Sequence, residues 1–199
     1  MNSLLYIHGF NSSEQSYKAK VLSDAMMAIG MSECFLSPRL PWQPTKAITL
    51  LEEIVETHLE AYGASSITLI GSSLGGFYAS YLAEKFKIKA ILVNPAVTAP
   101  SLLMSHIGPQ YNPYTGEHYE LTPVHMDELA TLVIKHPTPE LYWLMIQEGD
   151  EVLDYRAALA AFPDTLRLTQ EVGGNHRYAG FERFTQEILS FSGITSNSH

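Results

Sequence analysis

The sequence feature that most constrains the fold is an apolar run that ends in a glycine- and serine-rich turn. Residues 66–71 read SITLIG, which predicts a buried β-strand. Residues 74–86 follow at once and are rich in Ala, Leu and Tyr, which predicts a helix. A strand that turns abruptly into a helix is the first half of a β-α-β unit, and such units build parallel sheets. The turn therefore predicts an α/β protein.

The rest of the chain repeats this alternation of short apolar runs and longer amphipathic stretches. The pattern is typical of a mostly parallel sheet flanked by helices. Strands are predicted at 4–7, 34–36, 90–93, 141–146 and 166–172, and helices at 16–29, 47–62 and 181–191.

The alternation fails between Pro95 and Pro139, where prolines, glycines, tyrosines and histidines crowd together. One helix is predicted there, at residues 126–134. We interpret residues 96–138 as a small helical insertion over the carboxyl edge of the sheet. Residues 1–195 are expected to form a single domain, with residues 196–199 as a frayed tail.

Composition excludes several classes of function. The formal net charge is −9, which disfavours nucleic acid because that partner is bound through clustered Lys and Arg. The single cysteine, Cys34, excludes an internal disulfide, and no His or Cys pair has the spacing of a metal site. We therefore expect no metal site.

No segment of the sequence predicts a membrane or export signal. The N-terminus lacks a basic region, and no apolar run approaches the roughly 20 residues that span a bilayer. A cytoplasmic protein without membrane insertion is the expectation.

Gly71-Ser72-Ser73-Leu74-Gly75 matches the G-x-S-x-G nucleophile elbow, in which a strained turn exposes a serine above the sheet. Glycines at 71 and 75 let strand and helix approach closely enough to hold Ser73 in that conformation. Ser72 lies one position out of register and is the weaker candidate. The alternative is a structural glycine-rich turn; a P-loop does not fit, because no Gly-Lys-Ser/Thr follows.

A serine hydroxyl needs a neighbouring base, and histidine is the usual one. His176 is the best candidate, because it lies between the last predicted strand and the last helix, where a loop can carry it over the sheet edge. The remaining histidines are interpreted as loop-shaping, solvated or structural side chains: His8, His58, His106, His118, His125, His136 and His199.

A carboxylate that orients the histidine should come between serine and histidine in the chain. Asp150 is the first choice, because it follows the strand predicted at 141–146. Asp154 is the rival, although it is well placed to be the N-cap of a following helix. Glu148 and Glu151 are weaker candidates.

Two backbone N–H groups are needed to stabilise an oxyanion. Leu74, directly after Ser73, should supply one, and Phe10, in the loop after the first strand, the other. The alternative for the second position is that His8-Gly9 only makes a tight turn.

Five motifs of the chain occur in the same order in one family. They are His8-Gly9-Phe10-Asn11-Ser12-Ser13, Gly71-Ser72-Ser73-Leu74-Gly75-Gly76, Asn94-Pro95-Ala96, Gly149-Asp150-Glu151-Val152 and Gly173-Gly174-Asn175-His176. From about residue 3 to the final helix the chain closely resembles the YqiA/YcfP-like bacterial esterases. The resemblance implies a compact α/β-hydrolase fold and hydrolysis of acyl esters, with acyl-CoA-like thioesters as further substrates. When the family's functional residues are matched to this sequence position by position, the resemblance implies a catalytic triad of Ser73, Asp150 and His176. It also implies an oxyanion hole at Phe10 and Leu74, and no cofactor.

The sequence therefore predicts a serine esterase that works through an acyl-enzyme intermediate on a small-molecule acyl ester or thioester. Two alternatives stay open at this point: a catalytically inactive relative that binds a small molecule or a partner, and a serine amidase or peptidase. Apolar residues of the insertion are candidates for lining an acyl pocket, namely Leu102, Leu103, Met104, Ile107, Tyr111, Tyr114 and Tyr119. The oligomeric state is not predicted.

Overall fold

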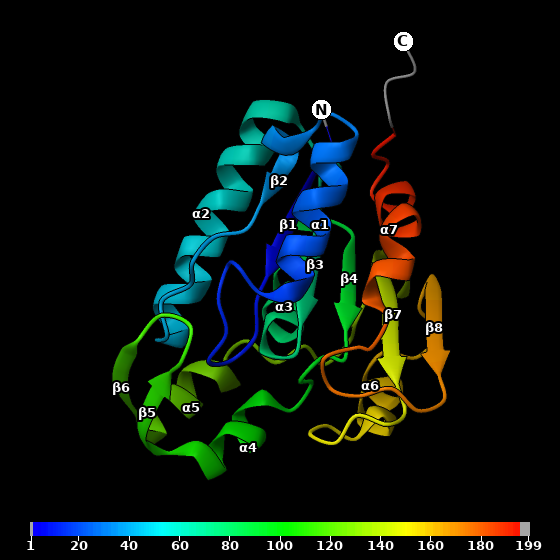
Figure 1. The fold of residues 1–199 in the computed structure, drawn as a ribbon. Coiled ribbons are helices and arrows are strands. Elements are labelled where there is room, and N and C mark those ends of the chain that lie inside the picture. Colours follow the sequence, from blue (N-terminus) through cyan, green and yellow to red (C-terminus); the bar gives the residue numbers. More distant parts are fainter. Residues whose placement is uncertain (1, 196–199) are drawn as a thin grey trace.

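A six-stranded sheet runs through the centre of the computed structural model, which describes residues 2–195 (Figure 1). The strand order is β2-β1-β3-β4-β7-β8, and every neighbouring pair is parallel. The strands are β1 (Ser3–Ile7), β2 (Phe35–Leu36), β3 (Ile67–Ser72), β4 (Ala90–Val93), β7 (Tyr142–Gln147) and β8 (Arg167–Glu171).

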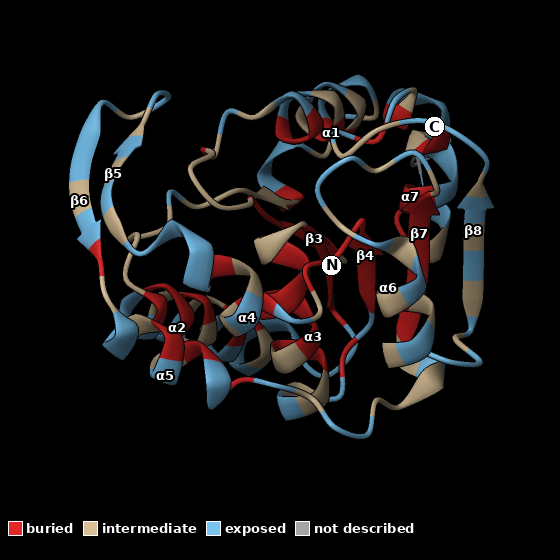
Figure 2. Cartoon of the chain, turned by 90° about the horizontal axis from the view of Figure 1, so that it is seen from below, coloured by how far each residue is buried: buried red, intermediate tan, exposed pale blue. Residues whose placement is uncertain are grey.

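The four inner strands are buried along their whole length, which explains their near-continuous apolar sequences. Seen from the carboxyl ends of the strands, β3, β4 and β7 form the buried centre (Figure 2). Strand β8 at the edge alternates between partly buried and exposed residues. Register places Ile7 beside Gly71 and Ser72 beside Val93, so three neighbouring strands end side by side.

Helices cover both faces of the sheet because their apolar sides pack on it. One apolar cluster joins the sheet to α1 (Tyr17–Ala28) and α7 (Thr185–Phe191). The other joins the opposite face to α2 (Pro44–Tyr62), α3 (Leu74–Phe86) and α6 (Tyr155–Ala161). Short 3₁₀ turns are η1 (Ser32–Cys34), η2 (Met104–His106), η3 (Pro139–Leu141) and η4 (Phe181–Phe184).

The predicted α/β architecture is confirmed, and most predicted elements agree with the observed ones to within three residues. The helix predicted at 181–191 is divided into η4 and α7. The tail predicted at 196–199 lies outside the described residues.

The insertion differs from the prediction. It contains α4 (Ala99–Leu103), an antiparallel hairpin of β5 (Gly108–Asn112) and β6 (Glu117–Leu121), and α5 (Pro123–Ala130). The insertion predicted as helical therefore also contains a β-hairpin that was not predicted, and the helix predicted at 126–134 begins and ends earlier. The hairpin is polar and largely exposed, so it has no apolar alternation by which to recognise it.

Three hydrogen bonds hold this hairpin against the loop that follows β1, and in one of them the Asn11 side-chain amide donates to Gln110 Oε1 over 3.3 Å. The Asn112 side-chain amide donates to the Ser12 carbonyl over 2.9 Å, and the Tyr119 hydroxyl donates to Asn11 Oδ1 over 2.6 Å. The insertion thus lies below the carboxyl edge of the sheet in Figure 1, next to the loop expected to supply an oxyanion donor.

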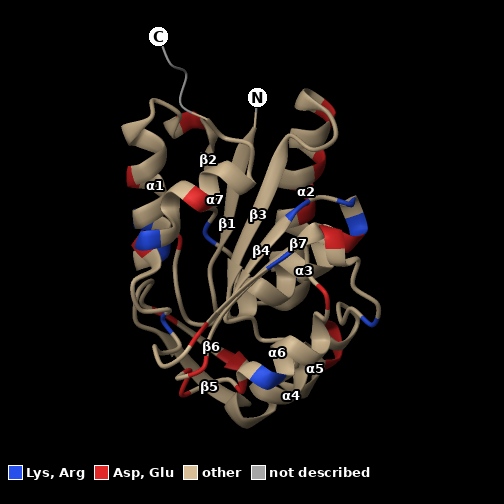
Figure 3. Ribbon diagram, turned by 90° about the vertical axis from the view of Figure 1, so that its right-hand side faces the viewer, with Lys and Arg blue, Asp and Glu red and all other residues tan. Residues whose placement is uncertain are grey.

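Acidic residues outnumber basic ones, 21 to 12, and Figure 3 shows them on α2 and α5 among other elements. Within residues 2–195, none of the helices combines the length and the apolar character that a bilayer crossing requires.

Candidate active site

Ser73 occupies a strained turn between β3 and α3. Its backbone has φ 56° and ψ −120°, in a region that residues with a side chain rarely adopt. The Ser73 N–H donates to the Val93 carbonyl over 3.1 Å, and its carbonyl accepts from Gly76 and Ala96 over 2.9 and 3.0 Å. The strained conformation is therefore held from both sides by β4 and α3.

The glycines around Ser73 are required by close backbone packing. A Cβ added at Gly71 would overlap the Gly75 backbone, and one added at Gly75 would overlap the Ile7 carbonyl. The absence of a side chain at Gly71 thus lets the strand and the helix of the elbow approach each other, and its absence at Gly75 lets the elbow fit against the end of β1.

His176 lies in the loop after β8, and its ring nitrogen Nδ1 is 2.9 Å from Oδ2 and 3.0 Å from Oδ1 of Asp150. The Asp150 side chain is only 2% exposed, whereas the imidazole is 22% exposed. Asp150 follows the end of β7, so two adjacent strands of the sheet deliver the pair.

The Asp150 carboxylate is held in its ionised form. Burial raises its pKa, but hydrogen bonds from His176 and from the Leu153 and Val152 N–H groups outweigh burial, and the pKa lies below its ordinary value. An ionised acid next to Nδ1 favours the tautomer that carries its proton there and leaves Nε2 free to accept one.

Asp154, the rival carboxylate, does not contact His176. Its side chain caps α6 by accepting from the Arg156 N–H over 3.0 Å, and it is 55% exposed. Glu151 instead accepts from the His176 backbone N–H over 2.9 Å, while Glu148 accepts from the Gln170 side chain.

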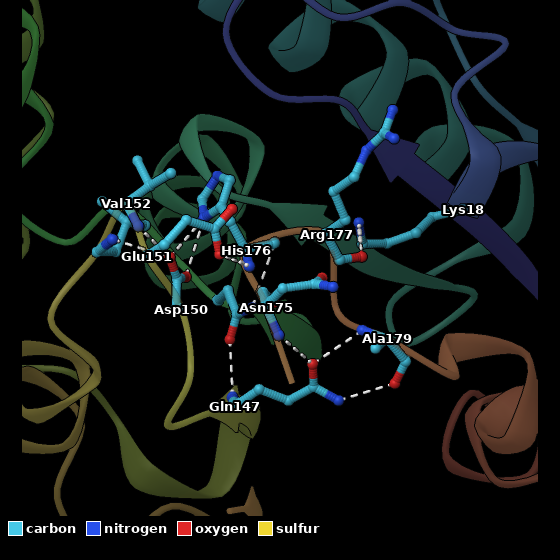
Figure 4. Close-up of polar contacts among 11 residues, drawn as sticks. Lys18, Gln147, Asp150, Glu151, Val152, Asn175, His176, Arg177 and Ala179 are labelled. Carbon is cyan, nitrogen blue, oxygen red and sulfur yellow. Dashed lines mark hydrogen bonds and ion pairs between the residues drawn. The ribbon is translucent and has the colours of Figure 1, made fainter. Parts of the chain in front are cut away.

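Two buried amide side chains hold the histidine loop, and neither was singled out from the sequence for this role. Gln147, 2% exposed, accepts from the Asn175 and Ala179 N–H groups over 3.0 and 2.8 Å and donates to the Ala179 carbonyl (Figure 4). Asn94, 3% exposed, donates to the Asn175 and His176 carbonyls and accepts from the Gln147 N–H.

Ser73 and His176 line one cavity of about 480 Å³ at the carboxyl edge of the sheet. None of the hydrogen bonds among residues 2–195 joins the Ser73 hydroxyl to the imidazole directly. His176 is the only histidine among the residues that line this cavity. The structure therefore brings the predicted serine, histidine and aspartate to one place.

His8 shapes the loop after β1, as its neighbouring glycine had indicated. Its Nε2 accepts from the Leu40 N–H over 3.3 Å, and its Nδ1 lies 3.0 Å from the Gly9 carbonyl. Burial, the largest influence, lowers its pKa, so the neutral ring that these contacts require is favoured.

The two predicted oxyanion donors lie next to the elbow. A Cβ added at Gly9 would be 3.2 Å from the Ser72 carbonyl oxygen and 3.9 Å from the Leu74 nitrogen, so the β1 loop runs against the start of α3. Phe10 follows Gly9 and lines the same cavity as Ser73. Within residues 2–195, neither the Phe10 nor the Leu74 N–H donates a backbone hydrogen bond in a loop or turn.

Most of the apolar insertion residues do not line the cavities beside Ser73. Tyr114 lines the cavity of about 480 Å³, and Tyr119 lines a second one of about 40 Å³. Met104, Ile107 and Tyr111 are exposed to solvent. The remaining two, Leu102 and Leu103, pack against the apolar core.

Comparison with known families identifies the family of this chain. A model described as an uncharacterised protein family, UPF0227, matches residues 3–193. The chain belongs to this family. The match confirms the resemblance to the YqiA/YcfP-like proteins that the motifs had indicated.

Solved structures similar to this UPF0227 chain are α/β-hydrolase-fold proteins. Est1E from Butyrivibrio proteoclasticus, solved with ferulic acid bound, has a TM-score of 0.66 at 14% identity, covering 96% of this chain and 88% of that one. Mouse alpha/beta hydrolase domain-containing protein 10 has a TM-score of 0.65 at 17% identity, covering 95% and 88%. An esterase from Pyrococcus furiosus has a TM-score of 0.66 at 14% identity, covering 96% and 80%. At these identities the likeness establishes the α/β-hydrolase fold.

In the described part of the chain, no group of three or more His, Cys, Asp or Glu side chains is arranged to hold a metal ion.

Proposed function

We propose that the chain is a serine hydrolase that cleaves acyl esters and acyl thioesters with Ser73 as nucleophile. The observation that carries this proposal is the pairing of His176 with a buried, ionised Asp150 beside the cavity that Ser73 lines. A serine in a strained turn next to a histidine that a carboxylate orients is the arrangement that acyl transfer requires.

In the first half-reaction the Ser73 oxygen attacks the acyl carbonyl carbon while Nε2 of His176 accepts the hydroxyl proton. The Phe10 and Leu74 N–H groups stabilise the resulting oxyanion. The bond to the leaving oxygen or sulfur then breaks, and His176 gives its proton to that atom. The alcohol or thiol departs and an acyl ester of Ser73 remains.

Water repeats these steps in the second half-reaction. His176 takes a proton from the water as its oxygen attacks the acyl-enzyme, and the proton then passes to the Ser73 oxygen. The products are the free carboxylic acid and the unchanged enzyme. Asp150 keeps its charge throughout and stabilises the imidazolium that forms twice in each cycle.

Family membership and the esterases and lipases among the structural neighbours support an ester as substrate. Thioesters belong in the proposal because the same attack applies to them and a thiol leaves more readily than an alcohol. Cytoplasmic residence is part of the proposal, supported by a single, buried cysteine. The charge of −9 disfavours a nucleic acid substrate.

The test compares Ser73→Ala with Ser72→Ala on p-nitrophenyl acyl esters. Both variants lose one hydroxyl from the same turn, so Ser72→Ala controls for any local disturbance. We expect Ser73→Ala to lose on the order of 10⁴-fold or more in kcat and Ser72→Ala to stay within about tenfold of the wild type. Wild-type rates in Ser73→Ala would refute the nucleophile.

A further inference from the structure

The cavity beside Ser73 has a positive charge balance that contrasts with the chain as a whole. The protein carries 21 acidic and 12 basic residues, yet no Asp or Glu is among the residues that line this cavity. Two cationic side chains line it, Lys18 and Arg177. A cavity whose walls carry only one sign of formal charge focuses the field and attracts groups of the opposite sign.

Lys18 is buried although no carboxylate neutralises it. It lies in the first turn of α1 and is 8% exposed, and its Nζ donates to the Arg177 carbonyl over 2.8 Å (Figure 4). None of the ion pairs within residues 2–195 involves Lys18. An ammonium has three donors, and the carbonyl occupies one of them. A buried charge without a counter-charge is costly, so a role for the remaining donors is indicated.

Arg177 contributes the second charge at the exposed side of the cavity. It directly follows His176, and its guanidinium donates to the Tyr114 hydroxyl over 3.3 Å. No described carboxylate pairs with it either. The guanidinium therefore retains donors for a planar anionic group.

The start of α1 adds to this field. Ser16, Tyr17 and Lys18 line the cavity, and the N-cap Ser16 makes no side-chain capping bond to the helix. The first N–H groups of a helix and its dipole favour an anion at that end.

The position of the cations identifies the half of the substrate that they would meet. His176 must protonate the leaving group, so the leaving group lies on the side of the imidazole, where Arg177 follows in the chain. The smaller cavity shares residues 9–12 with the larger one, and its other walls carry both Arg39 and Glu117, so it has no excess of positive charge. Lys18 and Arg177 share the larger cavity with the imidazole, so they would meet the leaving group.

We propose that Lys18 and Arg177 form a subsite for an anionic oxygen group, a carboxylate or a phosphate, on the alcohol or thiol half of the substrate. This inference rests on the proposed esterase function and deepens it. It predicts that esters with a negatively charged leaving group are better substrates than neutral esters of the same acid.

The experiment uses two esters of one acyl chain: the p-nitrophenyl ester and its analogue with a ring carboxylate next to the nitro group. For each protein the ratio of the two kcat/KM values is measured on one preparation, so any unfolded fraction cancels. The two esters differ in intrinsic reactivity, but this difference is the same for every protein, so it cancels when the ratio for a variant is divided by the ratio for the wild type.

Lys18→Met keeps the length of the side chain but removes its charge, and we expect it to lower the ratio roughly tenfold or more. Arg177→Gln should also lower the ratio of the two kcat/KM values. Lys20→Gln is the matched control: it removes one positive charge from the same helix, is not among the cavity residues, and should leave the ratio unchanged. A purely structural Lys18 would slow both esters equally and leave the ratio intact.

Hydrolysis of the neutral ester separates the two proposals. If wild-type protein hydrolyses it and Ser73→Ala does not, but Lys18→Met and Arg177→Gln both keep the wild-type ratio, the subsite is wrong and the esterase stands. If wild-type protein hydrolyses neither ester, the esterase itself is wrong. Inhibition of the wild-type protein by inorganic phosphate and by benzoate identifies the anionic group. Competitive inhibition by phosphate that weakens in Lys18→Met indicates a phosphate group, and the same behaviour with benzoate indicates a carboxylate. If neither anion inhibits the wild-type protein, the subsite is contradicted.

Discussion

The Asp150 carboxylate lies 2.9 Å from Nδ1 of His176 and is almost completely shielded from solvent, although 25 residues separate the two in the sequence. Strands β7 and β8 are neighbours in the sheet, and the loops after them bring the two side chains together. The pair therefore depends on the sheet order, and the bond orients the imidazole with Nε2 available as a base.

Asp150→Asn tests this relationship. An amide in place of the carboxylate no longer favours the proton on Nδ1 or stabilises the imidazolium, so kcat for ester hydrolysis should fall on the order of 10⁴-fold. Asp154→Asn is the control, because that side chain caps α6 and Asn caps a helix equally well. Comparable rates for the two variants would show that Asp150 does not serve His176.

Gln147→Met tests the support of the histidine loop. The change removes the acceptor of two N–H groups, at Asn175 and Ala179, in a buried position. Each unsatisfied group costs about 1–3 kcal/mol, so the loop should open and kcat should fall roughly tenfold or more with little change in KM. Hydrogen exchange should quicken at residues 173–179.

Gln170→Met is the matched control for that loop. Gln170 lies on β8 and is exposed, and its side chain donates to the Glu148 carboxylate. Gln170→Met should have the kcat of the wild type and the same rates of hydrogen exchange at residues 173–179. If Gln147→Met behaves in the same way, the hydrogen bonds to the loop do not position His176.

Gly75→Ala tests the packing of the elbow against β1. The added methyl group overlaps the Ile7 carbonyl, a rigid backbone atom, so the free energy of unfolding should fall by about 3 kcal/mol or more. Gly116→Ala is the comparison: nothing lies near an added Cβ there, and only the positive φ of 71° opposes it, at about 1 kcal/mol. Urea unfolding measures both, and an equal loss would contradict the account of the elbow.

Glu84→Gln tests a partly buried hydrogen-bond network that joins α3 to β7. The Glu84 carboxylate accepts from the Tyr142 hydroxyl and the Thr138 hydroxyl over 2.8 Å each, and from Lys87. Burial raises its pKa, but these hydrogen bonds outweigh burial and the pKa lies below the ordinary 4.5. The stability gained from ionised Glu84 is therefore present above pH 4.5 and is lost as pH falls through the lowered pKa.

Glu84→Gln should therefore have a lower free energy of unfolding than the wild type in urea at pH 7. The difference between the two free energies should shrink as the pH falls below about 4. Glu53→Gln, at an exposed position on α2, is the control for the loss of one negative charge from the chain. A Glu84→Gln difference of constant size at every pH would mean that the charge of Glu84 contributes nothing.

Local patterns in the sequence predicted the α/β fold and the candidate residues of the site. The elbow could be recognised because a strand that turns directly into a helix needs glycines at fixed spacing around the serine, and Asp150 and His176 because each follows a strand. The roles of Asn94 and Gln147 could not, since their partners are set by strand pairing between distant segments. Lys18 belongs to an amphipathic helix, and only the packing of the loop at 173–180 against it shows that it is buried.

The nucleophilic role of Ser73 is the central claim, and covalent labelling tests it most directly. The protein is treated with a fluorophosphonate, digested, and the modified residue is located by fragmentation of the peptide that carries Ser72 and Ser73. We predict one adduct, on the Ser73 oxygen, that forms much more slowly in Asp150→Asn. Absence of an adduct, or an adduct on any other residue, would contradict the account.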